Sequence, residues 1–324
     1  MMSKNKILCI VGPTATGKTD VGISLAKKLN GEIIACDSRQ VYKDLDIGTG
    51  KMPGVDVPYE RKDRCWIIDG VPVWGYDMVF ATSQYDVSQY VSDIKEVIAD
   101  VVSRGKLPII VGGTGLYLKG LLSGFGQMGV PVDLALREEL EQLSLNDIQN
   151  YLRKIDQEQF QLLNDSEKHN KRRLIRKIEI ELLKDTVKEN VEDGIAKDFD
   201  VLKVGLETKR EVLYDRIDLR VVKRVESGMI EEADGLHRNG LTFNRMRELG
   251  LEYRMLADFL EGKIKTKAEF IEKLQFKIHQ YAKRQLTWFK VDKEIVWFDI
   301  MEITRKSTKL SPVEEYVLDW YNIK

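Results

Sequence analysis

The residues best suited to chemistry form one segment near the start of the chain, Gly12-Pro13-Thr14-Ala15-Thr16-Gly17-Lys18-Thr19. It follows an apolar run at 7–11 and precedes apolar residues at helical spacing, so it joins a strand to a helix. In that context the loop directs backbone N–H groups at an anion, and the helix dipole adds to the attraction. Lys18 can reach phosphate oxygens, and the Thr19 hydroxyl can hold Mg²⁺. We therefore predict a phosphate-binding loop (P-loop) that holds a diphosphate through Gly12, Thr14, Ala15, Thr16, Gly17, Lys18 and Thr19.

Two further strand ends carry candidate catalytic groups. An apolar run at 31–36 ends on Asp37, and another at 107–111 ends in Gly112-Gly113-Thr114. Asp37 could accept a proton from an attacking amine or hydroxyl, or could cap a helix. The Gly-Gly-Thr turn could approach phosphate oxygens, or could be a tight turn with an N-capping threonine. Nucleotide-hydrolysing enzymes usually place a magnesium-binding aspartate after such a strand, so this turn weakens an ATPase interpretation.

The elements that must position these groups alternate between strand and helix. An amphipathic helix is predicted at 86–104, between the apolar runs at 31–36 and 107–111. Such alternation implies right-handed crossovers and a parallel sheet. Asp69-Gly70 between two short apolar runs predicts a β-hairpin, and Pro72 places that hairpin at an edge of the sheet.

The pattern changes at about residue 131, where charged helices without a convincing strand begin. Strand character returns at 201–206 and again at 294–299, so the sheet resumes after this helical stretch. We predict an α/β fold, in which a P-loop NTPase-like parallel sheet is flanked by helices and carries a helical insertion domain. The predicted bounds are 1–130 for the first part of the core, 131–198 for the insertion, and 199–324 for the second part with the C-terminal helices.

Composition narrows the classes of function. The chain has 51 lysines and arginines against 52 aspartates and glutamates, so any basic surface must be local. The basic segment 168–177 could bind phosphates, or could be a solvated helix face near Glu179. The three cysteines lack metal-ligand spacing and indicate a reducing compartment. No apolar run approaches the about 20 residues that cross a membrane, and no signal peptide is evident, so we expect a cytoplasmic protein.

Short blocks spread through almost the whole chain resemble the tRNA dimethylallyltransferases, the tRNA isopentenyl transferase family. These blocks lie in the family's order at 12–19, 37–42, 46–49, 112–117, 213–220, 228–232 and 281–289. Residues 54–82 depart from the family pattern, in a region that normally borders the substrate cleft.

The resemblance implies transfer of a dimethylallyl group from dimethylallyl diphosphate to the N6 amine of the adenosine 3′-adjacent to the anticodon in tRNA. The P-loop would then hold a leaving diphosphate, which accounts for the missing aspartate after the 107–111 strand. Lys18, Thr19 with Mg²⁺, Thr114 and Arg220 are implied to stabilise the charge that builds on the diphosphate. Asp37 is implied to receive a hydrogen bond or a proton from the amine. The implied catalytic residues are thus Asp37, Thr114 and Arg220.

The implied partner is the anticodon stem-loop of tRNA, from which the adenine must leave the base stack. We expect no membrane partner and a monomeric protein. By resemblance, the residues that contact tRNA are Asp37, Ser38, Arg39, Gln40, Arg137, Arg172, Arg173, Arg176, Lys283, Arg284 and Gln285.

Three alternatives stay open. An adenylate isopentenyltransferase would modify free AMP, ADP or ATP, but such a substrate needs neither the basic insertion nor the block at 283–289. A small-molecule P-loop kinase would use Asp37 as the base for an acceptor hydroxyl. A non-catalytic RNA-binding paralogue is disfavoured, because Asp37, Lys18 and Thr19 are all present.

Overall fold

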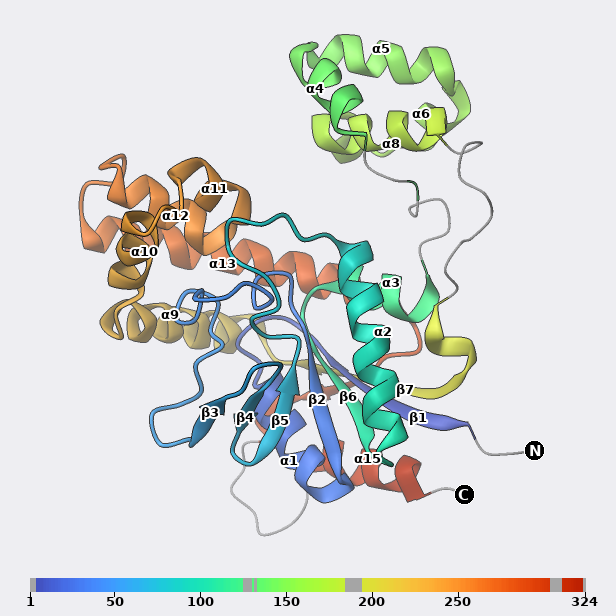
Figure 1. The fold of residues 1–324 in the computed structure, drawn as a ribbon, viewed down its shortest axis with the longest axis vertical. Coiled ribbons are helices and arrows are strands. Elements are labelled where there is room, and N and C mark those ends of the chain that lie inside the picture. Colours follow the sequence, from blue (N-terminus) through green and yellow to red (C-terminus); the bar gives the residue numbers. More distant parts are fainter. Residues whose placement is uncertain (1–3, 125–129, 131–132, 184–193, 304–310, 323–324) are drawn as a thin grey trace. The chain divides into compact units, whose positions relative to one another are not determined.

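The computed structural model describes residues 4–124, 130, 133–183, 194–303 and 311–322 (Figure 1). The chain forms two compact units. The core unit comprises Met1–Leu121 and Ile195–Lys324, and the helical unit comprises Leu122–Gly194. The predicted insertion, 131–198, starts later than the helical unit and ends later, and its residues 131–132 and 184–193 lie outside the described ranges.

Within the described residues, the core unit contains an eight-stranded sheet in the order β3-β4-β5-β2-β6-β1-β7-β8. All neighbouring pairs are parallel except β3 with β4 and β4 with β5. The predicted α/β class with a mainly parallel sheet is confirmed. The strands are β1 (Asn5–Val11), β2 (Gly31–Cys36), β3 (Tyr59–Arg61), β4 (Trp66–Ile68), β5 (Val71–Trp74), β6 (Leu107–Gly112), β7 (Phe199–Glu207) and β8 (Val296–Asp299).

Helices cover the sheet because most residues of its central strands β1, β2 and β6 are apolar and buried. Residues at alternate positions of β1, β2 and β6 share one core with apolar residues of α1 and α15. Helix α2 packs against β6, and its buried Tyr90 hydroxyl donates to the Ala35 carbonyl at 2.9 Å. The helices of the core unit are α1 (Lys18–Leu29), α2 (Val87–Ser103), α3 (Gly115–Ser123), α9 (Arg210–Glu226), α10 (Met229–Arg238), α11 (Phe243–Leu249), α12 (Leu251–Leu260), α13 (Lys267–Phe289), α14 (Ile300–Ile303) and α15 (Pro312–Asn322), with a 3₁₀ turn at η2 (Ile195–Lys197).

The hairpin predicted around Asp69-Gly70 is confirmed, since β4 and β5 pair antiparallel and both turn residues have positive φ. It lies toward one end of the sheet, but its proline is not on an edge strand. Strand β5 stands between β4 and β2, and β3 forms the edge. Pro72 is tolerated there because pairing with β2 involves only Val73 and Trp74, so no ladder bond needs the missing N–H of proline.

The helical unit has a core of its own. Its helices are α4 (Leu134–Gln142), α5 (Leu145–Ile155), α6 (Gln157–Leu162), α7 (Asp165–Lys168) and α8 (Lys171–Leu183). Leu140, Ile148, Leu152, Leu174 and Ile178 are buried together at its centre. Capping side chains accept from the first turn of α4, α5, α6 and α7, which explains why so many short helices follow one another. No helix among the described residues of the chain meets the length and apolarity needed to cross a membrane.

Candidate active site

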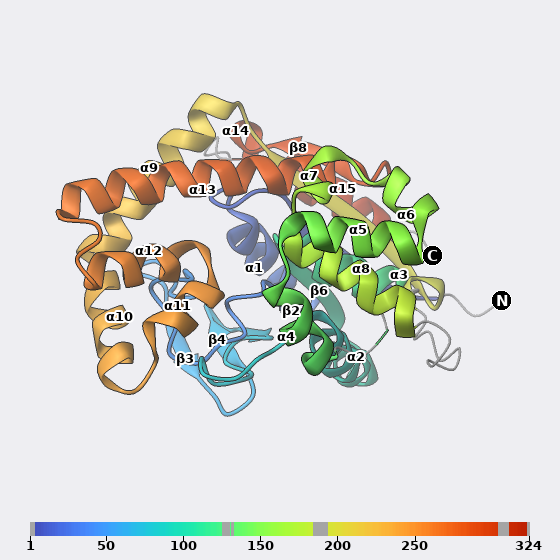
Figure 2. The same cartoon turned by 90° about the horizontal axis from the view of Figure 1, so that it is seen from above.

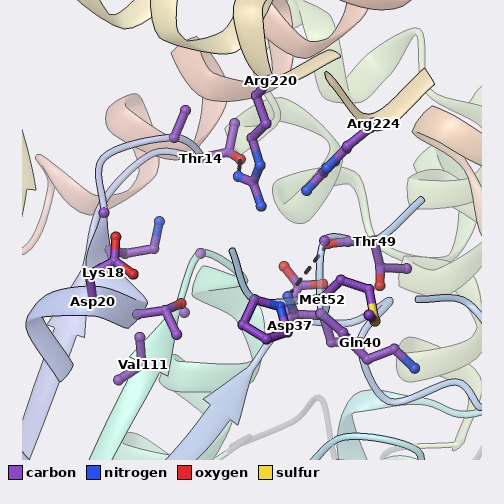
Figure 3. A pocket seen from close by; sticks show the side chains of 18 of the residues that line it. Thr14, Lys18, Asp20, Asp37, Gln40, Thr49, Met52, Val111, Arg220 and Arg224 are labelled. Carbon is purple, nitrogen blue, oxygen red and sulfur yellow. Dashed lines mark hydrogen bonds between the residues drawn. The ribbon is translucent and has the colours of Figure 1, made fainter. Parts of the chain in front are cut away.

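A cavity of about 620 Å³ opens in the core unit beyond the carboxyl ends of β1, β2 and β6. Its wall combines the predicted P-loop, the turn after β2, the loop 49–54 and one side of α9. Figure 3 shows Lys18 and Asp20 on one side of the cavity, Asp37 and Gln40 on the other, and Arg220 extending toward Thr14. Seven cationic side chains and three carboxylates of the described residues line this space, so it favours an anionic ligand.

The P-loop adopts the conformation that its glycines permit. Gly12 has φ 136°, and a Cβ there would lie 2.3 Å from the Leu206 carbonyl oxygen of β7, so only glycine lets the loop pass this strand. Gly17 is the N-cap of α1, and no side chain caps that helix. The first N–H groups of α1 are therefore available to an anion. Lys18 curls back over the loop, where its Nζ donates to the Pro13 carbonyl at 2.7 Å.

Two half-buried cations, Lys18 and Arg220, lie at the P-loop, and a third, Arg224, lies beside Arg220 and donates to the Gly48 carbonyl at 3.3 Å. Burial and the neighbouring Arg220 lower the pKa of Lys18 from 10.5 to about 7. Burial lowers the pKa of Arg220, and burial together with Arg220 lowers that of Arg224 to about 9. Arg220 donates to the Thr14 hydroxyl at 3.1 Å, and Arg216 donates to the Ala15 carbonyl at 2.8 Å. These clustered positive charges favour binding of a multiply charged anion. A bound anion would in turn stabilise the protonated forms of Lys18 and the arginines and raise their lowered pKa values.

Sequence reasoning singled out Arg220 but missed Arg216 and Arg224. The three arginines stand four residues apart, so a helix places them along one side, and α9 turns that side toward the cavity. The i, i+4 spacing is the signal that could have identified them. Glu252 of α12 is the other missed group: its carboxylate lies 3.7 Å from Arg224 and 4.0 Å from Arg39.

The turn after β2 carries Asp37 into the cavity wall. The Asp37 Oδ1 accepts from the Arg39 N–H at 2.9 Å, so the carboxylate shapes its own turn and also faces the cavity. Arg39 stacks on the Tyr281 ring, with 4.9 Å between guanidinium carbon and ring centroid. Arg39 and Gln40 line the cavity, whereas Ser38 turns its N–H to the Thr114 hydroxyl at 3.1 Å. Thr114 thus ties the end of β6 to the turn that bears Asp37.

Gln285 of α13, which the resemblance names as a tRNA contact, is buried beside the P-loop and not exposed on the surface. It is 5% exposed, its Oε1 accepts from the Thr14 N–H, and its Nε2 donates to the Gly113 carbonyl, both at 2.9 Å. The side-chain amide therefore joins the P-loop to the turn after β6. Lys283 and Arg284, in contrast, are exposed on α13. Helices α9 and α13 lie against each other (Figure 2). The Gln285 and Arg220 side chains consequently reach the same residue of the P-loop, Thr14.

The region that departs from the family pattern is attached to the site by a buried lysine. Lys51 donates to the Tyr42 carbonyl at 2.8 Å and pairs with the carboxylates of Asp46 and Asp77. The Trp66 indole N–H also donates to Asp77, at 2.7 Å. The hairpin is thereby fastened to the 46–49 block, and the region adds Val57, Ile68 and Tyr76 to the cavity wall.

In the helical unit, the predicted tRNA contacts divide into two groups. Arg137 makes a two-point ion pair with the fully buried Glu179, at 2.7 and 2.8 Å, and Arg176 binds the same carboxylate at 2.9 Å. These two arginines neutralise an internal charge. Arg172 and Arg173 are exposed, and their side chains have no partner among the described residues.

Comparison of the sequence with known proteins identifies the family of this chain. The family model for IPP transferase matches residues 40–292. The tRNA dimethylallyltransferase 2 of Treponema denticola is 38% identical over 294 residues, which is 90% of this chain and 93% of that protein. A tRNA dimethylallyltransferase of Streptococcus pyogenes serotype M6 is 41% identical over 296 residues, 89% of each chain.

Solved structures give the same result. The tRNA isopentenylpyrophosphate transferase of Bacillus halodurans superposes with a TM-score of 0.66 at 33% identity, covering 98% of this chain and 96% of that one. A eukaryotic dimethylallyltransferase acting on tRNA superposes with a TM-score of 0.75 at 26% identity, covering 97% and 78%. The chain therefore belongs to the IPP transferase family, as a relative of the tRNA dimethylallyltransferases.

Proposed function

We propose that the cavity is the site where a dimethylallyl group passes from its diphosphate to N6 of the adenosine 3′-adjacent to the anticodon in tRNA. The observation that carries this proposal is that the P-loop, the half-buried cations of α9 and Asp37 all lie in the wall of one cavity. A donor diphosphate and an acceptor base can then occupy opposite sides of the same space.

The donor side consists of the P-loop and the cations around it. The free N–H groups at the start of α1, together with Lys18 and Arg220, would hold the diphosphate. Thr19 would hold Mg²⁺, with Asp20 beside it as a second oxygen ligand lining the cavity. Mg²⁺ usually takes one or two protein oxygens and completes its shell with phosphates and water. When bound, the ion would neutralise diphosphate charge.

The transfer breaks the bond between C1 of the dimethylallyl group and the diphosphate oxygen, and the electron pair leaves with the diphosphate. The N6 lone pair forms the new carbon–nitrogen bond, and the released N6 proton passes to Asp37. The cations that face the P-loop stabilise the charge on the leaving group. The adenine amine is a weak nucleophile, so its orientation toward C1 contributes more than the basicity of Asp37.

The acceptor side consists of Asp37, Arg39 and Gln40, with the tRNA extending from there. We assign Thr114 and Gln285 to positioning, since Thr114 binds Ser38 and Gln285 joins two loops. Lys283, Arg284, Arg172 and Arg173 remain proposed tRNA contacts, and Arg137 and Arg176 remain so only through the faces that Glu179 leaves open. A cytoplasmic monomer stays our expectation.

The test of the function is a labelling experiment. The protein is incubated with labelled dimethylallyl diphosphate and Mg²⁺, with either unmodified tRNA or free AMP and ATP as the acceptor. Label in tRNA at the adenosine beside the anticodon is the expected result. Label in free nucleotide would instead indicate an adenylate isopentenyltransferase, and phosphate transfer without prenyl transfer would indicate a kinase.

The double variant Arg172→Ala/Arg173→Ala should weaken tRNA binding, mainly at low salt. If both side chains contact phosphates, the slope of log affinity against log salt should fall by about 1 to 2, because each contact releases roughly one counterion. Binding isotherms at several salt concentrations measure this slope.

The matched control is Arg153→Ala/Lys154→Ala, which removes the same charge from exposed positions of α5 in the same unit. We expect its slope to equal that of the unmodified protein. Equal slopes for both double variants would remove Arg172 and Arg173 from the interface.

A further inference from the structure

The loop 46–49 is held by a carboxylate that lies far away in the sequence. Glu232 of α10 accepts from three successive backbone N–H groups, those of Asp46 at 3.0 Å, Ile47 at 2.6 Å and Gly48 at 3.0 Å. Its Oε1 also accepts from the Tyr253 hydroxyl of α12 at 2.6 Å. One side chain therefore receives four hydrogen bonds and joins this loop to two helices.

The hydrogen bonds to Glu232 fix the conformation of loop 46–49. Successive backbone N–H groups that converge on one point form a nest for an anion, and hydrogen bonds to a carboxylate are about twice as strong as neutral ones. The Tyr253 ring packs on the loop so closely that a Cβ on Gly48 would lie 2.6 Å from its hydroxyl. The carboxylate in the nest and the glycine against the ring therefore both favour this conformation of the loop.

The loop in turn orients the acceptor side of the cavity. The Gly48 carbonyl accepts from Arg224 at 3.3 Å, and the Thr49 carbonyl accepts from the Gln40 amide at 3.5 Å. Thr49, Gln40 and Arg224 all line the cavity, whereas Glu232 does not. On the donor side, the P-loop is held by other groups, among them Gln285 and Arg216.

We infer that Glu232 is a positioning residue for the acceptor nucleotide, which acts by holding loop 46–49 and leaves diphosphate binding unaffected. This inference rests on the proposed function, in which the adenine enters beside Asp37 and Gln40.

The test compares Glu232→Gln with Tyr253→Phe and with the control Glu231→Gln. The neighbouring Glu231 is exposed and makes no hydrogen bond or ion pair in the part of the chain that the structure describes. For Glu232→Gln, whose amide N–H₂ would face backbone N–H donors, we expect KM and the dissociation constant for an anticodon stem-loop to rise about tenfold or more. The dissociation constant for inorganic pyrophosphate with Mg²⁺ should stay within about twofold.

Tyr253→Phe removes one of the four hydrogen bonds and should raise the same RNA constants by a factor of about 2 to 5. It also carries the test if Glu232→Gln does not fold. The inference is overturned if RNA binding is unchanged in the variants, or if RNA and pyrophosphate binding weaken equally. Absence of prenyl transfer by the unmodified protein would refute the proposed function instead, because the RNA and pyrophosphate dissociation constants still report on Glu232.

Discussion

Replacing Asp37 by alanine is expected to lower kcat by a factor of about 10² to 10⁴, the range that a positioned proton acceptor contributes. The dissociation constant for the anticodon stem-loop should change by less than about threefold, because Asp37 is one contact among many in a nucleic-acid interface. The reason is geometric: Asp37 stands at the end of β2, facing the P-loop across the cavity, where an adenine amine must be aimed at carbon. Single-turnover rates and equilibrium binding of the same RNA measure the two quantities.

Asp37→Asn is the matched control for the fold. Its side-chain oxygen can still accept from the Arg39 N–H, as Asp37 does at 2.9 Å, so the turn after β2 is retained. Its amide cannot take up a proton, so kcat should stay low while the melting temperature equals that of the unmodified protein. Normal turnover combined with lost RNA binding would assign Asp37 to recognition and not to the transfer.

Lys18→Met should reduce kcat/KM by about 10²-fold to 10³-fold, as removal of one preorganised charge-stabilising group does in other enzymes. Inorganic pyrophosphate affinity should fall with it, because the half-buried ammonium group lies in the P-loop, where we propose that the leaving diphosphate is held. Calorimetric titration with pyrophosphate and Mg²⁺ measures the loss. Asp37→Ala should leave that affinity unchanged, and the two variants together separate leaving-group stabilisation from acceptor orientation.

The same lysine predicts a pH dependence. Its pKa in the free protein is about 7, lowered by burial and Arg220, and the anion binds the protonated form. The advantage of the unmodified protein over Lys18→Met in pyrophosphate affinity is therefore complete below about pH 7. It decreases by up to about tenfold per pH unit above that value, until the raised pKa of the complex is reached. The ratio of the two affinities cancels the titration of pyrophosphate itself, and a constant ratio from pH 6 to 9 would contradict the assignment.

Much of the core fold can be predicted from patterns of residues that are neighbours in the sequence. The P-loop, the amphipathic helix before β6 and the Asp69-Gly70 hairpin are local patterns, and each adopts the predicted structure. The prediction that Pro72 lies at an edge of the sheet was wrong. A proline shows which backbone N–H is missing, but it does not show at which residue the neighbouring strand begins to pair. The family resemblance names Arg137 and Arg176 as tRNA contacts, and nothing nearby in the sequence indicates that Glu179 is buried between them.

By itself, the sequence determined the phosphate-binding loop, the alternation of strands and helices, and the resemblance to a prenyltransferase family. These depend on residue types within a turn or two of one another, where spacing alone decides which face a side chain occupies. Only the tertiary structure decided that Gln285 joins two loops at separations of 271 and 172 residues, and that Glu232 fills a nest 184 to 186 residues distant. It also decided that Arg216 and Arg224 share the cavity with Arg220. Such pairings arise from the packing of whole helices against the sheet, and the energy of a buried hydrogen bond depends on partners that local sequence does not name.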